Sequence, residues 1–199
     1  MTARISRAFS FQAGAYFKNS FTMNLYHIDI DFHLETSSMK EQNIALERIK
    51  YFISEIIENS ILINSSQTEM IEKYQSADFK ICALPEDPYD QIIAIMLMVK
   101  CNTITEGKLI ITDIAITSRL SDNVYCNHSI EENIGPFKDP GWWSENNDKI
   151  NSLKPYKSKK VVKLTKSFSS WENLWLGWEE NTTSYTNEVV FVNFDNKDK

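Results

Sequence analysis

Nearly continuous apolar side chains fill the segment after Asp87 and Pro88, which reads YDQIIAIMLMVKCN over residues 89–102. Asp is a good helix N-cap and Pro fits the first helical position, so we expect a helix over residues 88–103. A helix that is apolar on all sides is buried rather than lying at a surface. Other elements of the chain must therefore cover this helix.

A strict alternation of apolar and polar side chains marks the segment LYHIDIDFHL, residues 25–34. The apolar positions are Tyr26, Ile28, Ile30, Phe32 and Leu34, and the polar positions are His27, Asp29, Asp31 and His33. A period of two residues is typical of a strand with one face in the core and one face in solvent.

Weaker patterns predict the remaining elements. The capping box formed by Ser38 and Glu41 opens an amphipathic helix, with Glu47, Arg48 and Lys50 on its polar face. Ser66 and Glu69 form a second capping box before a short helix. Short strands and a hairpin complete the pattern, and the expected ranges are 39–59 for the long helix, 60–64 and 79–84 for strands, and 108–117 with 123–128 for the hairpin.

These elements predict an α+β fold, with a mixed or mainly antiparallel sheet, about three helices packed against it and a C-terminal extension. We expect residues 1–23 to be a disordered extension or a mis-assigned start, and residues 24–145 to form the core domain. Residues 146–170 form a lysine-rich arm, and residues 171–199 form a tryptophan-containing extension that packs back on the core.

Charge is segregated along the 199 residues, whose net charge is -6. Residues 23–148 contain 21 acidic and 9 basic side chains, whereas residues 149–166 contain seven lysines and no acid. An acidic body repels nucleic acid, so single-strand binding would depend on the arm, through Lys157, Lys159, Lys160 and Lys163. A solvated arm is the simpler interpretation.

Several segments together resemble a family of small proteins from large contractile-tailed bacteriophages, especially marine ones. They are EQNIALERIKYFI (41–53), LPEDPYDQIIAIMLMVK (84–100), EGKLIITD (106–113), LSDNVYC (120–126) and GWW (141–143). That family has no known activity, so the resemblance implies a viral origin and expression in the cytoplasm of the host bacterium. It implies no catalytic residues.

The polar positions of the first strand pattern are the sharpest candidate for chemistry. His27, Asp29, Asp31 and His33 project from one face of a strand, and two imidazoles with two carboxylates are a ligand set for a divalent metal. Neighbouring positions on one face are rather far apart, so a second strand would have to add Asp113 or His128. Four polar side chains facing water on a one-sided sheet are the simpler interpretation.

The paired tryptophans Trp142 and Trp143 follow the turn residues of a DPG sequence. They are the candidate anchor for a protein partner, and a core position for one of the rings is an equal alternative. Cys82, Cys101 and Cys126 sit in apolar runs, and this odd, widely spaced set indicates buried thiols rather than disulfides or a zinc site.

The residues favour a non-catalytic accessory protein that acts through protein–protein contacts, with no cofactor. No phosphate-binding glycine loop or nucleophile elbow occurs in the chain. The alternatives are a metal-dependent hydrolase or nuclease that uses the four polar residues of the first strand, and a single-strand binder that uses the arm. We expect a cytoplasmic location in the host or a place in the virion, and no contact with a membrane.

Overall fold

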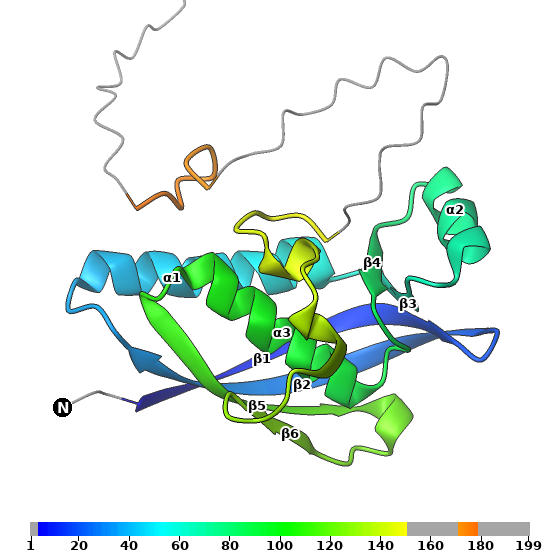
Figure 1. Ribbon diagram of the computed structural model, residues 1–199, viewed down its shortest axis with the longest axis horizontal. Coiled ribbons are helices and arrows are strands. Elements are labelled where there is room, and N and C mark those ends of the chain that lie inside the picture. Colours follow the sequence, from blue (N-terminus) through cyan, green and yellow to red (C-terminus); the bar gives the residue numbers. More distant parts are fainter. Residues whose placement is uncertain (1–3, 151–170, 179–199) are drawn as a thin grey trace, which may run out of the picture.

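The computed structural model describes residues 4–150 and 171–178 of the chain (Figure 1). Its centre is a six-stranded sheet with the strand order β4-β3-β1-β2-β5-β6. The long strands β1 (Arg4–Phe17) and β2 (Ser20–Leu34) form an antiparallel hairpin. On one side, β5 (Leu109–Ser118) pairs antiparallel with β2, and β6 (Cys126–Ser129) pairs antiparallel with β5.

At the other edge of the sheet, the strands pair in parallel. β3 (Ile61–Asn64) pairs parallel with the end of β1, and β4 (Ile81–Leu84) pairs parallel with β3. The sheet is therefore mixed, and the predicted α+β class is confirmed.

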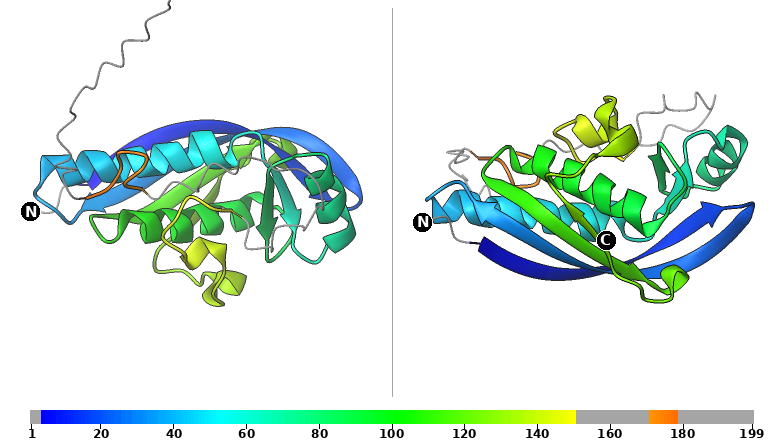
Figure 2. Two further views of the ribbon diagram at one scale, coloured as in Figure 1. Left: turned by 90° about the horizontal axis from the view of Figure 1, so that it is seen from above. Right: turned by 60° about the horizontal axis from the view of Figure 1, so that its bottom comes forward.

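Helices α1 (Met39–Tyr51) and α3 (Asp90–Thr105) lie on the same face of the sheet (Figure 2). A π-helical turn, η1 (Phe52–Ile57), continues α1. Side chains of both helices form one core cluster with Phe11, Tyr26, Ile28, Ile30 and Phe32 of the central hairpin. The alternation that predicted strand 25–34 thus places its apolar half against the helices.

Helix α2 (Thr68–Ser76) packs on the opposite face, where it covers the parallel end of the sheet. Ile61, Ile63, Ile81 and Ala83 point to α2, whereas Leu62 and Cys82 between them point to the main core. The strands β3 and β4 are therefore buried on both faces, as parallel strands usually are.

Helix α3 confirms the buried core helix, because its residues 92–98 are all buried. Its start differs from the prediction. The helix begins at Asp90 after an N-cap at Tyr89 that has no side-chain cap bond, so Asp87 is not the N-cap. Instead, a carboxylate oxygen of Asp87 accepts a hydrogen bond from Asn64 Nδ2 at 3.0 Å, which ties the end of β3 to this loop.

The prediction that residues 1–23 form a disordered extension is wrong for residues 4–23, and residues 1–3 lie outside the described chain. Residues 4–17 form β1, a central strand that pairs with both β2 and β3. Phe11 is buried and stacks on Tyr26 with ring centroids 4.8 Å apart. The core domain therefore includes this hairpin, and a boundary at residue 24 would cut through β2.

The end of the described chain returns to the core. The short helical turn η2 (Arg119–Ser121) lies between β5 and β6, and two more, η3 (Gly135–Lys138) and η4 (Trp142–Ser144), follow β6. Residues 171–178 pack on the core through Trp171, Leu174, Leu176 and Trp178. The predicted packing of the C-terminal extension is thus observed for this segment, and the rest of the extension lies outside the described residues.

Candidate functional site

Much of one sheet face is covered by no helix of the described chain. The side chains on this face are small, or short and polar. This open face is formed by the first half of β1 together with β2, β5 and β6. The strand register aligns residues of this face in rows that cross the four strands. One row consists of Ser6, Asp31, Asp113 and Ser129, and the next consists of Ala8, Asp29, Ala115 and Asn127. Alternation along each strand turns all these positions away from the core.

A shallow hollow lies in the open face. Asp29, Asp31, Asp113, Ala115 and Asn127 contribute to its lining. The hollow brings two of the predicted residues of β2 together with Asp113 of β5, which the sequence indicated as a contributor from a second strand. Three carboxylates at one place make this the most acidic feature of the open face.

The four polar residues of β2 do not converge as one ligand set. His27 and Asp29 are exposed, Asp31 and His33 are half-buried, and neither histidine lines the hollow. Ser6 Oγ donates a hydrogen bond to Asp31. Within residues 4–150 and 171–178, no group of three or more His, Cys, Asp or Glu side chains is placed to hold a metal ion.

His128, the other proposed second-strand ligand, lies on the wrong face for that role. It is buried, and its register partner on β5 is the core residue Ile114. Its Nδ1 atom is 3.2 Å from the carboxylate of Glu132. A ligand set that combines the polar face of β2 with His128 would need side chains from both faces of the sheet.

The paired tryptophans are buried, so of the two alternatives that the sequence left open, the structure places both rings in the core and not on an exposed surface. Trp142 is 3% exposed and Trp143 is 9% exposed. Trp142 Nε1 donates to the main-chain oxygen of Ala83 on the edge strand β4 at 2.8 Å, so the indole covers that edge. Trp143 Nε1 donates to the main-chain oxygens of Phe137 and Asp139. Both rings find partners inside the fold, which the sequence left open.

Lys100 holds the segment that carries these tryptophans. Its ammonium is fully buried and donates to the main-chain oxygens of Trp142 and Glu145, at 3.0 and 2.6 Å. Burial lowers the pKa of Lys100 to about 8, although the neighbouring Glu145 opposes that shift. The sequence pattern gave no sign of this role, because a lysine at the end of an apolar helix usually reaches solvent.

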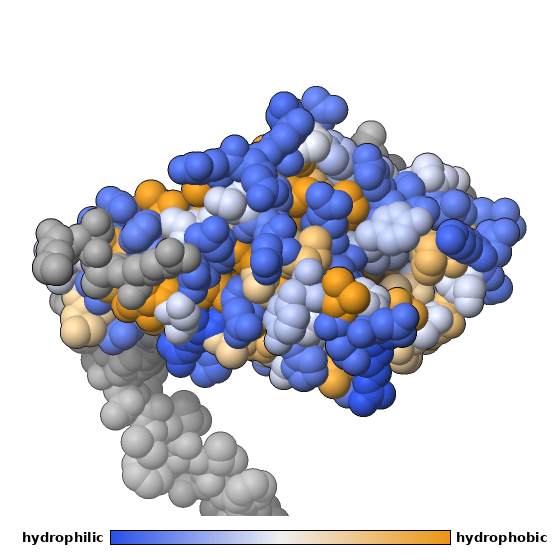
Figure 3. All heavy atoms as spheres, turned by 90° about the horizontal axis from the view of Figure 1, so that it is seen from below, coloured by the Kyte–Doolittle hydropathy of each residue, from blue (hydrophilic) through white to orange (hydrophobic). Residues whose placement is uncertain are grey.

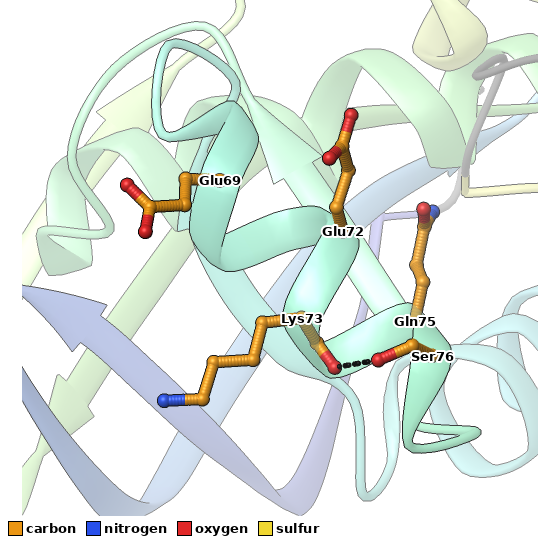
Figure 4. A pocket seen from close by; sticks show the side chains of 5 residues that line it. All are labelled: Glu69, Glu72, Lys73, Gln75 and Ser76. Carbon is orange, nitrogen blue, oxygen red and sulfur yellow. Dashed lines mark hydrogen bonds between the residues drawn. The ribbon is translucent and has the colours of Figure 1, made fainter.

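A second shallow hollow lies on α2, a place that the sequence did not single out. Glu69, Glu72, Lys73, Gln75 and Ser76 line it, and all five come from this one helix (Figure 4). The labelled side chains point in different directions, and Ser76 Oγ donates to the main-chain oxygen of Lys73 at 2.7 Å. Side chains that diverge from one short helix do not surround a ligand.

Cys82 and Cys101 are buried free thiols, and Cys126 is a half-buried free thiol. Lys157, Lys159, Lys160 and Lys163 lie outside the described residues, as does most of the arm. Among the described helices, none has the length and apolar character needed to span a bilayer.

Comparison with known proteins places the chain in no family. No family model matches the sequence, and no curated protein matches it. One solved structure with a similar chain path is an uncharacterised protein, WS1659 from Wolinella succinogenes. The two share 9% sequence identity with a TM-score of 0.44, and the match covers 66% of this chain and 99% of that one.

Proposed function

We propose that this protein is a non-catalytic accessory protein that acts through protein–protein contacts, with the open face of the sheet as its contact surface. One observation carries the proposal: α1 and α3 cover one face of the sheet, while no helix of the described residues covers the opposite face of β2, β5, β6 and the first half of β1. The proposal concerns a binding surface and assigns no reaction.

The chemistry of the open face suits a basic partner. Its acidic hollow contains Asp29, Asp31 and Asp113, and the short side chains of Ala8 and Ala115 allow a partner to approach the strands closely. Lysine or arginine side chains of a partner would meet the carboxylates, which favours correct orientation and fast association. We therefore expect the partner to present a positively charged surface.

Apolar side chains next to the open face could supply the desolvated part of such an interface. Val124 and Tyr125, just before β6, are 65% and 63% exposed. Seen from below, the surface is mainly hydrophilic with separate apolar groups, rather than one large apolar patch (Figure 3). A polar contact area with a few apolar anchors is typical of a non-obligate interface.

The proposed setting is the cytoplasm of a phage-infected bacterium, and it rests on the sequence resemblance described above. Single-strand binding by the arm stays a prediction, because Lys157, Lys159, Lys160 and Lys163 lie outside the described residues. Metal-dependent hydrolysis also stays a prediction, and no described group of three donors favours it.

The experiment compares charge reversal on two faces of the protein. Tagged wild type, the double variant Asp29→Lys/Asp113→Lys and the control Glu72→Lys on exposed α2 are captured from infected cells after cross-linking. We expect a defined set of partners with wild type and control, and its loss with the double variant. Recovery of the same partners by all three proteins, or of none reproducibly by wild type, would overturn the proposal.

A further inference from the structure

An arginine lies buried beneath the C-terminal segment, although its helix pattern placed it on the polar face of α1. Arg48 is 1% exposed. Its Nη1 atom donates to the main-chain oxygen of Ile104 at 2.9 Å and to Glu106 Oε1 at 2.7 Å. Both acceptors belong to the end of α3, so two of the hydrogen bonds that orient the guanidinium come from the core domain.

Residues 171–178 complete the surroundings of the guanidinium. Arg48 Cζ lies 3.9 Å from the ring centroid of Trp178 and 4.9 Å from that of Trp171. Arg48 Nε donates to the main-chain oxygen of Leu176 at 2.8 Å. Among the aromatic side chains, an indole gives the strongest cation–π interaction, and the interaction is stronger when water is excluded.

Both indole nitrogens are also recognised by the core domain. Trp178 Nε1 donates to Glu106 Oε1 and Trp171 Nε1 donates to Asn146 Oδ1, each at 2.9 Å. Partial burial would raise the pKa of Glu106, but hydrogen bonds from Arg48, Trp178 and Asn146 hold it below its ordinary value. The site therefore keeps a carboxylate beside the cation, ready to accept from an indole N–H.

The segment is compact in itself and adds no strand to the sheet. Its main chain closes on itself, since Leu176 N donates to the Trp171 oxygen at 2.8 Å. Gly177 lets this turn pack closely, because a Cβ atom there would lie 3.2 Å from Glu172 Cγ and 3.3 Å from Glu172 Cα. Trp175 remains 60% exposed, whereas Trp171 and Trp178 contact the Arg48 guanidinium.

We propose that the surface around Arg48 is a peptide-binding site, and that residues 171–178 occupy it as an intramolecular ligand. The site selects two tryptophans seven positions apart, joined by a turn that brings both rings onto one guanidinium. When the segment leaves, Arg48 keeps Ile104 and Glu106 as partners, so the core domain stays folded and the site opens to a peptide of the same chemistry.

The test separates ligand from core by cutting the full-length chain. A recognition sequence for a site-specific protease is inserted after Lys160, outside the described residues. After cleavage, we expect the C-terminal fragment to remain bound at high protein concentration and to dissociate on dilution, while the larger fragment keeps a cooperative thermal transition. A larger fragment that loses its transition when the C-terminal fragment leaves would show that residues 171–178 belong to the core.

The affinity of the site is then measured by fluorescence anisotropy. A labelled peptide of residues 169–180 is titrated with the purified larger fragment. We expect binding at least about tenfold weaker for the peptide with Trp178→Ala, and for the protein with Arg48→Met. Arg119→Met, at an exposed arginine, is the matched control and should bind like wild type. The peptide variant leaves the protein untouched, so equal binding of the two peptides, or no binding of either, would overturn the proposal regardless of how Arg48→Met folds.

Discussion

The ammonium of Lys100 donates a hydrogen bond to the main-chain oxygen of Trp142 within the core, over 3.0 Å. The lysine side chain is fully buried there, and burial lowers its pKa from 10.5 to about 8. An ion at this position is tolerated because carbonyl oxygens replace part of its hydration. Lys100 thereby connects α3 to the loop whose tryptophan covers the edge of β4.

Replacement of Lys100 by Met should change how stability depends on pH. Between about pH 8 and 10.5 the unfolded chain binds the lysine proton and the folded chain does not, so the contribution of Lys100 to stability rises with pH by up to roughly 3 kcal/mol. Denaturant unfolding of both proteins at pH 7.5 and pH 10 measures the difference. A difference between wild type and Lys100→Met that is the same at both pH values would contradict the prediction.

The three thiols should differ in reactivity. Burial raises the pKa of all three thiols, to about 12 for Cys101, but Cys126 is only half-buried and is therefore the one that a reagent can reach. A thiol reagent at pH 8 should therefore modify Cys126 in the folded protein and the other two only after unfolding. Both buried thiols keep their protons when the unfolded chain loses them above pH 9, so they should lower stability as pH rises further. Rapid modification of all three thiols in the native protein would be incompatible with the fold.

Ile93→Asp should unfold the core domain. Ile93 is fully buried in α3, and an uncompensated carboxylate there should cost about 4 kcal/mol or more. Gln91→Asp, at an exposed position of the same helix, is the control and should melt like wild type. Similar melting temperatures for Ile93→Asp and the control would show that the buried-helix assignment is wrong.

Phe11→Ala tests whether β1 belongs to the fold in solution. Phe11 is buried and stacks on Tyr26, so its removal should cost about 3–5 kcal/mol of unfolding free energy. The neighbouring Gln12→Ala changes an exposed side chain and should stay within about 0.5 kcal/mol of wild type. Equal stability of the two variants would place β1 outside the cooperative unit.

Zinc or manganese should not stabilise the protein if the open face serves only for protein contacts. His27 and His33 lie outside the acidic hollow, so a tightly held ion would lack imidazole ligands there. We expect no shift in melting temperature on adding either metal, for wild type and for His27→Ala/Asp31→Ala alike. A rise in wild type that the double variant abolishes would favour the metal-dependent alternative.

Much of the fold was predictable where periodicity is strong. The alternation from Tyr26 to Phe32 and the apolar run after Asp90 each correspond to an observed element with the expected buried side. The same alternation is present in β1, where buried Phe11 and Ala13 alternate with exposed Ser10 and Gln12. Asn19, with φ of 58°, sits in the two-residue turn to β2, and Asn is common in such turns.

The surroundings of the large and charged side chains were not predictable in this way. An indole has a broad apolar surface and one N–H, so Trp142 and Trp143 fitted a core and an interface equally well. Arg48 was expected on the polar face of its helix and Lys100 had no predicted role, yet each donates to main-chain oxygens from elements distant in sequence. No local sequence pattern indicates where those main-chain oxygens lie in the folded protein.

The sequence alone determined which segments form strands and helices and which of their sides are apolar, because backbone geometry converts residue spacing directly into faces. Tertiary structure alone decided that Arg48 lies between two tryptophans, that Trp142 covers a sheet edge and that three aspartates share one hollow. Those relationships join residues far apart along the chain, and they exist only when the strands have taken their register and the helices their places.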